Sequence, residues 1–455
     1  MSVKVSLVAS LVALAVLAGC LGQGQDVSLG EPPAANFMAE VPAERLPVPD
    51  FDFSNVVVGE HQVPNGHGIR ALHSGSHGLE FVGFTDLGRL GDGRTAAFAA
   101  ADVWTTYVAV SSLAGGVAIV DIADPANPRV VSVAESGMVA ADVQFSDDGR
   151  YMFAGCFAGR DEAGAPMLAA TPLSLLSDAG ECGVTVWNVE DKANPRKLFN
   201  SETGTYHNLF TATINDTIWL FQVGGRVQKL VEEPEPHLVD VTRTEYMVHD
   251  LTVSRHPITG DWLMYTGGGE GGLQVYNIND PAKPLDVGRW TPEQDARGRA
   301  WHDQQPVLGT VGGRAILVGA GETGGGDQIP LVVLDITNTE NITLLGEWII
   351  PGKPENVGTG RVNFFTMGVH EYETWNGYVA IGHYHSGVWL IDVGTPERAA
   401  NPVTLGYYIP DRQGTSAPFA FNPDVWGAYF DDRGYIVATD VGSGLYVLKF
   451  GATLA

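Results

Sequence analysis

The stretch Gly116-Val-Ala-Ile-Val-Asp-Ile-Ala-Asp-Pro-Ala-Asn-Pro128 is the best guide to the architecture of this protein. It begins with a run of apolar and β-branched residues, which favours a β-strand, and ends in a turn that contains two prolines. Proline cannot donate a hydrogen bond to a sheet, so it marks where one strand ends before the next begins. The stretch therefore predicts a strand, a turn and a second strand.

The same theme returns along the chain, so the fold is built from repeats. Related copies lie at 183–195, 272–284, 330–338 and 387–396, and a shortened copy, 444–450, lies near the end of the sequence. Each copy is an apolar run that leads to Asp or Asn, or to Lys in the last copy. Repeats of this length with strand character are typical of β-propellers, in which each repeat forms one four-stranded blade.

A second aligned column lies upstream of each theme. Its polar members are Asp102, Asp142, Asn208, Asp250, Asp303 and Glu371, and Trp426-Gly427 fills the seventh place. The spacing of roughly 40 to 70 residues fits one blade per copy, with insertions in the longer copies. We expect this column to begin the first strand of each blade, and the Val-Asp theme to form the third strand.

We therefore predict an all-β fold, a single β-propeller over residues 79–455 with seven four-stranded blades. Six or eight blades are the alternatives, because the unit 207–245 has a weak pattern. The last copy lacks a fourth strand, and a spare strand, Leu79–Phe84, precedes the first copy. Pairing the spare strand with 444–450 would close the ring and remove both open sheet edges.

The stretch 117–128 resembles the hallmark of the LVIVD-repeat proteins, which are predicted propellers of bacterial and archaeal surfaces. The resemblance extends over about residues 79–450 and is most specific at 116–128 and 272–284. It implies a propeller exposed outside the cytoplasm. It implies no catalytic residues, because the family has no general activity to carry over.

The first residues look like a secretion signal. Lys4 is followed by an apolar run, Val5 to Leu17, and then by Leu17-Ala18-Gly19-Cys20. This ending is similar to the lipobox of bacterial-type lipoproteins, in which the peptide is cleaved before the cysteine and that cysteine receives lipid. We predict a signal peptide at 1–19, lipidation of Cys20 and an extended stalk over 20–78. An uncleaved anchor helix is the alternative, and both place the domain at a membrane, outside the cytoplasm.

Two further cysteines, Cys156 and Cys182, flank an insertion in the second unit. An even number of cysteines in an oxidising compartment favours a disulfide, which would close the neck of the insertion. Two buried free thiols are the alternative.

Four histidines precede the polar column in four successive units: His207, His249, His302 and His370. The first strand of each propeller blade lines the central channel, so these imidazoles would converge and bind copper, iron or zinc. The alternative is architectural, with Asp and Asn side chains that join neighbouring blades through backbone N–H groups. Ala101 and Ala141 in the same column favour the architectural interpretation.

The formal charge of −27 argues against a nucleic-acid partner. No nucleophile elbow, phosphate-binding loop or zinc-protease motif is present in the sequence. We therefore expect a lipid-anchored surface module that binds proteins, glycans or small ligands. The alternative is a metal-dependent enzyme, most plausibly an oxidoreductase, with its histidines in the channel.

Overall fold

The computed structural model describes most of one compact unit, Phe37–Ala455. The described residues are 39–58, 75–87, 98–112, 116–135, 139–158, 183–201, 208–244, 248–268, 272–291, 301–321, 330–354, 368–410 and 423–450. The predicted signal peptide 1–19, Cys20, Cys182 and His207 lie outside these residues. No helix among the described residues is long and apolar enough to cross a membrane.

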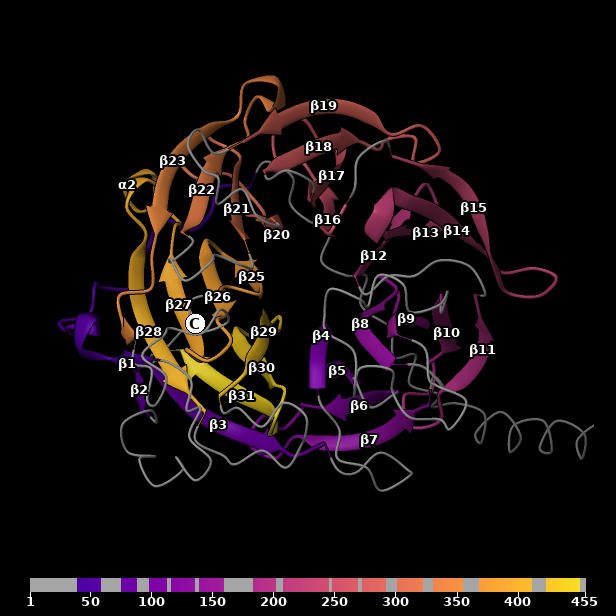
Figure 1. Ribbon diagram of the computed structural model, residues 1–455, viewed down its shortest axis with the longest axis horizontal. Coiled ribbons are helices and arrows are strands. Elements are labelled where there is room, and N and C mark those ends of the chain that lie inside the picture. The colour runs from indigo at the N-terminus through magenta and orange to yellow at the C-terminus, as the bar shows by residue number, and fades with distance from the viewer. Residues whose placement is uncertain are drawn as a thin grey trace, which may run out of the picture. The chain divides into compact units, whose positions relative to one another are not determined.

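The unit is a β-propeller, with sheets arranged around a central axis (Figure 1). Five sheets each contain four antiparallel strands in chain order. They are β4 (Phe98–Trp104), β5 (Tyr107–Ser112), β6 (Val117–Asp121) and β7 (Arg129–Ala134); β8 (Val139–Phe145), β9 (Tyr151–Ala158), β10 (Val184–Asn188) and β11 (Arg196–Asn200); β12 (Leu209–Ile214), β13 (Thr217–Gln222), β14 (Arg226–Val231) and β15 (His237–Arg243); β16 (Asp250–Arg255), β17 (Trp262–Gly267), β18 (Leu273–Asn277) and β19 (Leu285–Trp290); and β20 (Trp301–Pro306), β21 (Ile316–Gly321), β22 (Leu331–Asp335) and β23 (Thr343–Trp348).

A nine-stranded sheet completes the ring. In spatial order its strands are β2 (Gly75–His77), β28 (Val403–Ile409), β27 (Val388–Asp392), β26 (Tyr378–Gly382), β25 (Glu371–Trp375), β29 (Val425–Phe430), β30 (Tyr435–Asp440), β31 (Gly444–Phe450) and β3 (Leu79–Thr85). The parallel pair β25–β29 joins a unit of five antiparallel strands, which includes β2 at its outer edge, to a unit of four. Because this pair merges them into one sheet, the expected number of seven blades stays a prediction.

Short elements occupy the connections between the strands. They are β1 (Val57–Val58), which pairs with β24 (Lys353–Pro354), the 3₁₀ turns η1 (Phe53–Asn55), η5 (Val223–Gly225) and η6 (Thr339–Asn341), and the helix α2 (Pro396–Ala400). The all-β prediction is therefore confirmed, and the weakly patterned unit 207–245 also contains a regular four-stranded sheet, β12–β15.

Each copy of the repeated Val-Asp theme forms the third strand of its unit, as predicted, whereas the third strand of the sheet β12–β15, β14, lacks the theme. Four of the five residues of β6 are buried, and β10 and β18 have the same pattern. A middle strand of this kind is buried on both faces because a neighbouring sheet lies on either side, so its sequence is a continuous apolar run. The outer strands, such as β7 and β19, are partly exposed.

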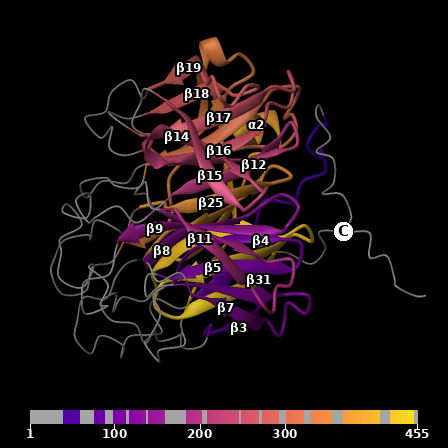
Figure 2. The same cartoon turned by 90° about the vertical axis from the view of Figure 1, so that its right-hand side faces the viewer.

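The ring closes where the sequence predicted. The strand β3 pairs antiparallel with β31, so that Leu79 lies opposite Phe450 and Thr85 lies opposite Leu445. The closed sheet packs on the sheet β4–β7, where Val437 and Val447 share a core with Val108 (Figures 1 and 2). The two ends of the propeller are thus joined by both backbone pairing and apolar packing.

The segment predicted as an extended stalk, 20–78, is different where the structure describes it. Residues 39–58 and 75–78 belong to the compact unit, and Val41, Phe53 and Val58 are buried in its core. The sequence hid this because the buried residues are separated by Pro, Glu and Asp residues and follow no strand or helix period. The propeller therefore includes an N-terminal segment that precedes the expected boundary at residue 79.

The predicted disulfide is only half described. Cys156 lies in β9 and is 1% exposed, whereas Cys182 lies outside the described residues. The pairing of these two cysteines stays a prediction.

Replacing Gly83 of β3 with Ala should weaken the closure of the ring. A Cβ atom at this position would lie 2.1 Å from the carbonyl oxygen of Pro125 and 2.9 Å from Pro128 Cδ. Because the clash is with backbone of the neighbouring sheet, we expect Gly83→Ala to lower the free energy of unfolding by about 1–3 kcal/mol. Urea denaturation measures this change, and Glu80→Ala, at an exposed position of the same strand, is the matched control. Equal stability of the two variants would contradict the described closure.

Candidate functional site

The polar column joins each sheet to the next around the axis. The innermost strands follow one another as β4, β8, β12, β16, β20, β25 and β29, and β29 contacts β4 again. A polar contact bridges every step of this circuit. The contacts are Phe145 N to Asp102 Oδ2 at 2.6 Å, Leu209 N to Asp142 Oδ2 at 2.8 Å, Asn208 Nδ2 to the His249 carbonyl oxygen at 3.5 Å, His302 Nδ1 to Asp250 Oδ2 at 3.1 Å, Tyr372 N to Asp303 Oδ2 at 3.1 Å, Phe430 N to Glu373 Oε2 at 2.6 Å and Ala101 N to the Tyr429 hydroxyl at 3.1 Å.

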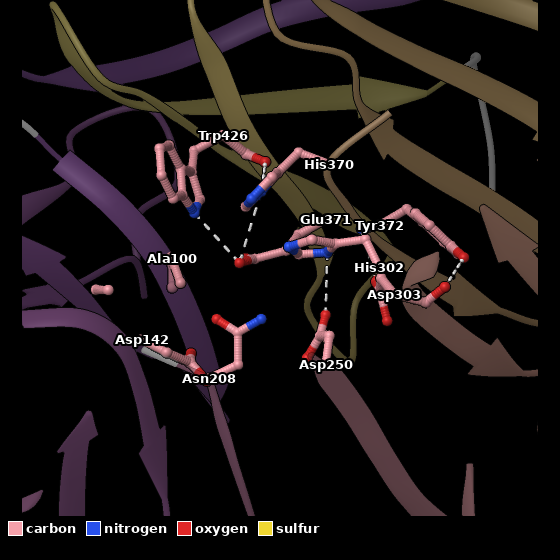
Figure 3. Close-up of polar contacts among 12 residues, drawn as sticks. Ala100, Asp142, Asn208, Asp250, His302, Asp303, His370, Glu371, Tyr372 and Trp426 are labelled. Carbon is pink, nitrogen blue, oxygen red and sulfur yellow. Dashed lines mark hydrogen bonds and ion pairs between the residues drawn. The ribbon is translucent and has the colours of Figure 1, made fainter. Parts of the chain in front are cut away.

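This circuit agrees with the architectural interpretation of the column. The carboxylates of Asp102, Asp142 and Asp303 each accept a backbone N–H from the next sheet, which satisfies a donor that has left water. In the step from β25 to β29 the joining carboxylate is Glu373, two residues beyond the expected Glu371. Glu371 instead accepts a hydrogen bond from Trp426 Nε1 at 3.2 Å (Figure 3) and another from the Tyr429 hydroxyl.

Three of the four predicted histidines do come together. The ring centroids of His249 and His302 are 4.8 Å apart, and those of His302 and His370 are 4.2 Å apart. His370 Nδ1 lies 2.9 Å from the Trp426 carbonyl oxygen, and its ring is 4.4 Å from the Trp426 ring. The three histidines thus form a row of packed rings. Figure 3 shows His302 and His370 of this row beside Asp250 and Glu371.

The packed rings are not arranged as a metal centre within the described residues. Among these residues, no group of three or more His, Cys, Asp or Glu side chains is placed to hold a metal ion. His302 pairs with the carboxylate of Asp250, the residue that follows His249 in the preceding unit. The described residues therefore give the copper, iron or zinc hypothesis no support, and His207 lies outside them.

A cavity of about 320 Å³ lies among the innermost strands. Its lining includes residues of β4, β8, β12, β16, β20, β25 and β29. Seven carboxylates line it: Asp102, Asp142, Asp147, Asp250, Asp303, Glu371 and Glu373. Over the described part of the chain, the wall carries no Lys, Arg or His side chain. The cavity therefore concentrates acidic side chains at the centre of the ring.

Desolvation and mutual repulsion make these carboxyl groups hard to ionise together. Burial raises the pKa of Asp102 to about 6, of Glu371 to about 7 and of Glu373 to about 8. Burial also raises the pKa of Asp142 and Asp303 well above the usual range, and the charges of Glu371 and Asp250 respectively add to the effect. A neighbouring positive charge would lower each of these pKa values and favour ionisation.

Asp250 is the exception in this cavity. Burial disfavours its ionised form, but the charge and hydrogen bond of His302, the Leu251 N–H and the charge of His249 together lower the pKa of the Asp250 carboxyl. The pKa of Asp250 is therefore shifted in the opposite direction to the pKa values of Asp102, Asp142, Asp303, Glu371 and Glu373.

The sequence column identified five of the seven acidic lining residues and missed Asp147 and Glu373. A signal for Glu373 was available, because Glu371 and Glu373 are two apart in one strand and so face the same side. The same spacing places Gln144 beside Asp142 and Gln305 beside Asp303 in the wall. Asp147 follows the end of β8, where no period could have placed it.

Comparisons with known proteins show the fold alone. No family model matches the chain, so its resemblance to the LVIVD-repeat family stays a prediction, and no curated protein matches either. The chain is similar to the structure of U3-55K, with a TM-score of 0.50, 13% identity and coverage of 82% of this chain and 98% of that one. It is less similar to Sqt1 of Saccharomyces cerevisiae, with a TM-score of 0.46, 11% identity and coverage of 82% of this chain and 88% of that one.

The buried carboxyl groups should make the propeller less stable in alkaline solution. A carboxyl whose folded pKa is raised stabilises the fold fully below its unfolded pKa of about 4, and loses this effect as pH rises through the folded value. For Asp102, Glu371 and Glu373 this loss extends through pKa values of about 6, 7 and 8. We expect the free energy of unfolding to fall between about pH 5 and about pH 9.

The variant Glu373→Gln isolates one of these groups. Its amide oxygen can still accept the Phe430 N–H, but the side chain can no longer acquire a charge. We expect this variant to exceed the wild type by roughly 4 kcal/mol at about pH 9 and to lie close to it at about pH 5, because each unit of pKa shift corresponds to about 1.4 kcal/mol. Denaturation at both pH values measures the difference, with the exposed Glu347→Gln as control. A pH profile unchanged by Glu373→Gln would contradict the assignment.

Proposed function

We propose that this protein is a binding module whose central cavity takes up a small organic cation with several amino groups. The observation that supports the proposal is the set of seven acidic side chains in the cavity wall, whose described lining includes no Lys, Arg or His. Asp250 and Glu371 have histidine neighbours, His302 and His370, but neither histidine lines the cavity. A bound ammonium group would lower the pKa of the nearby carboxyl groups and form charge-assisted hydrogen bonds with them. Ligand binding would thus offset the repulsion among the carboxylates of the cavity wall.

The distribution of the carboxylates favours an extended ligand over a metal ion. A metal ion needs several ligand atoms around one point, and the described residues contain no such group. The lining carboxylates instead come from β4, from β8 and the turn after it, and from β16, β20 and β25, around the axis. A linear oligoamine carries its charges apart, so it matches a ring of separated carboxylates better than a single ion does.

We also propose that the module is attached to the outer face of a cell membrane through lipid on Cys20. This proposal rests on the apolar run followed by Leu17-Ala18-Gly19-Cys20 at the start of the sequence. Attachment would keep the binding site at the cell surface, in contact with external solutes, proteins and glycans. Two or more acyl chains would make the attachment stable, whereas one chain would give only marginal binding.

Isothermal titration with spermidine, a linear triamine, tests the proposed ligand class. We expect saturable binding that weakens with added salt, because the interaction is between charges. Asp147→Asn and Glu371→Gln should each weaken the affinity by roughly tenfold, since each removes one charge-assisted contact. The matched control is Asp280→Asn, at an exposed turn that does not line the cavity. Absence of binding, or equal affinity in all variants, would refute the proposed ligand.

A Cys20→Ser substitution tests the lipid anchor separately. We expect the wild-type protein in the membrane fraction and the variant in the soluble extracellular fraction, because serine cannot carry the thioether-linked lipid. Mass spectrometry of the N-terminal peptide should find lipid on Cys20. An unmodified Cys20 in membrane-bound protein would favour the uncleaved anchor helix instead.

A further inference from the structure

Residues 39–58, here called the strap, cross from one sheet of the propeller to another before the chain reaches the closing strand β3. At its first end the strap binds the loop between β20 and β21. The Val41 N–H donates to the Thr310 carbonyl oxygen, and the Thr310 N–H donates to the Ala39 carbonyl oxygen, both at 2.8 Å. Glu40 adds side-chain contacts, accepting hydrogen bonds from the Thr310 hydroxyl and the Gly312 N–H at 2.5 Å.

The middle of the strap is held by a buried ion pair. Arg45 Nη2 lies 2.6 Å from Asp392 Oδ1, and Arg45 Nε lies 2.9 Å from Asp392 Oδ2, which is a bidentate arrangement. The two side chains are 5% and 0% exposed. The Arg45 guanidinium also lies 3.9 Å from the centre of the Tyr378 ring and donates to the Asn376 carbonyl oxygen at 2.7 Å. Asp392 ends β27, so this contact fixes the strap to the β25–β28 unit.

The last part of the strap is apolar. Phe53, Val56 and Val58 are buried in the same core as Trp389 and Ile350. The strand β1 within it pairs with β24 in parallel. The strap therefore binds successive parts of the propeller through polar, ionic and apolar contacts in turn.

The propeller surface beneath the strap has glycines at positions where a side chain would push the strap away. A Cβ at Gly394 would have only Arg45 atoms as its three nearest neighbours, the closest at 2.4 Å. A Cβ at Gly377 would lie 2.9 Å from Val41 Cγ1, and one at Gly352 would lie 2.8 Å from Val58 Cγ1. The fit of the strap thus depends on missing side chains at three places on the surface.

The order of these contacts along the chain has a mechanical consequence. A pull on the chain from the N-terminal side of residue 39 reaches the strap first, and reaches β3 only after the strap contacts have broken. We propose that the strap is a mechanical latch, which keeps tension at the N-terminal side of the chain away from the strand that closes the ring. The inference of such tension rests on the proposed membrane anchor at Cys20, whereas the latch itself rests on the contacts of residues 39–58.

Single-molecule pulling tests the latch without requiring the lipid. The full chain is held at one point before residue 39 and at a second point on the exposed turn at Asp280. We expect a first rupture that frees about 36 residues, 39–74, a contour length on the order of 120 Å, before the ring opens. A single rupture that unfolds the strap and the ring together would overturn the latch. That outcome would leave the lipid anchor untouched.

Two substitutions connect the first rupture to the Arg45 contact. Gly394→Ala adds only a methyl group, directed at Arg45, and Arg45→Ala removes the guanidinium itself. We expect each to raise the opening equilibrium constant of the strap on the order of a hundredfold, because each separates Arg45 from the buried Asp392 carboxylate, which then keeps Arg398 as its partner. Hydrogen exchange at the Val41 and Thr310 amides measures this opening, and exchange at β31 amides shows whether the ring stays closed.

The double variant Arg45→Ala/Gly394→Ala provides the matched control. Once Arg45 is shortened, the added methyl group no longer meets a guanidinium, so it should cause no further increase in exchange. Additive effects of the two substitutions would overturn the proposed role of this contact. Equal acceleration of exchange in the strap and in β31 would show that the strap is not a separable latch.

Discussion

The pairing of β3 with β31 is the interaction on which the rest of the structure depends. A propeller sheet buries both faces against its neighbours, so every sheet needs a partner on each side. The last copy of the repeat contributes only three strands, and its fourth strand comes from the front of the chain. With this strand in place, the innermost strands form a closed circuit and enclose a cavity. Without it, the edge of β31 would be left unpaired in the last sheet.

Closure also concentrates negative charge, which gives the cavity its chemical character. Each sheet places a polar side chain near the axis, where a carboxylate can accept the N–H of the next sheet. Because this carboxylate–backbone contact is repeated around the ring, several carboxyl groups lie close together in a partly dehydrated space. Each carboxylate–backbone contact is favourable at its own interface, but together these contacts bury several carboxyl groups near one another. The pKa values of Asp142, Asp303 and Glu371 are raised as a result.

The same reasoning explains why a column of histidines need not be a metal site. Equivalent positions in a propeller converge by symmetry, so any residue type placed in the column will meet its copies at the axis. His249, His302 and His370 use this proximity to pack ring against ring, and His302 pairs with Asp250. Convergence is therefore a property of the architecture, while ligation would require nitrogen atoms directed at one point.

Sequence alone determined the strands, their order and the way in which the ring closes. The apolar runs before Asp or Asn, the proline turns and the spare strand at 79–84 are local signals, because strand propensity and turn chemistry act over a few residues. Tertiary structure decided which distant segments contact one another and which side chains meet between the sheets. The contact of Arg45 with Asp392 spans 347 positions, and the acidic cavity draws on strands from most of the chain. No local period encodes such contacts, because they depend on which surfaces meet once the ring has closed.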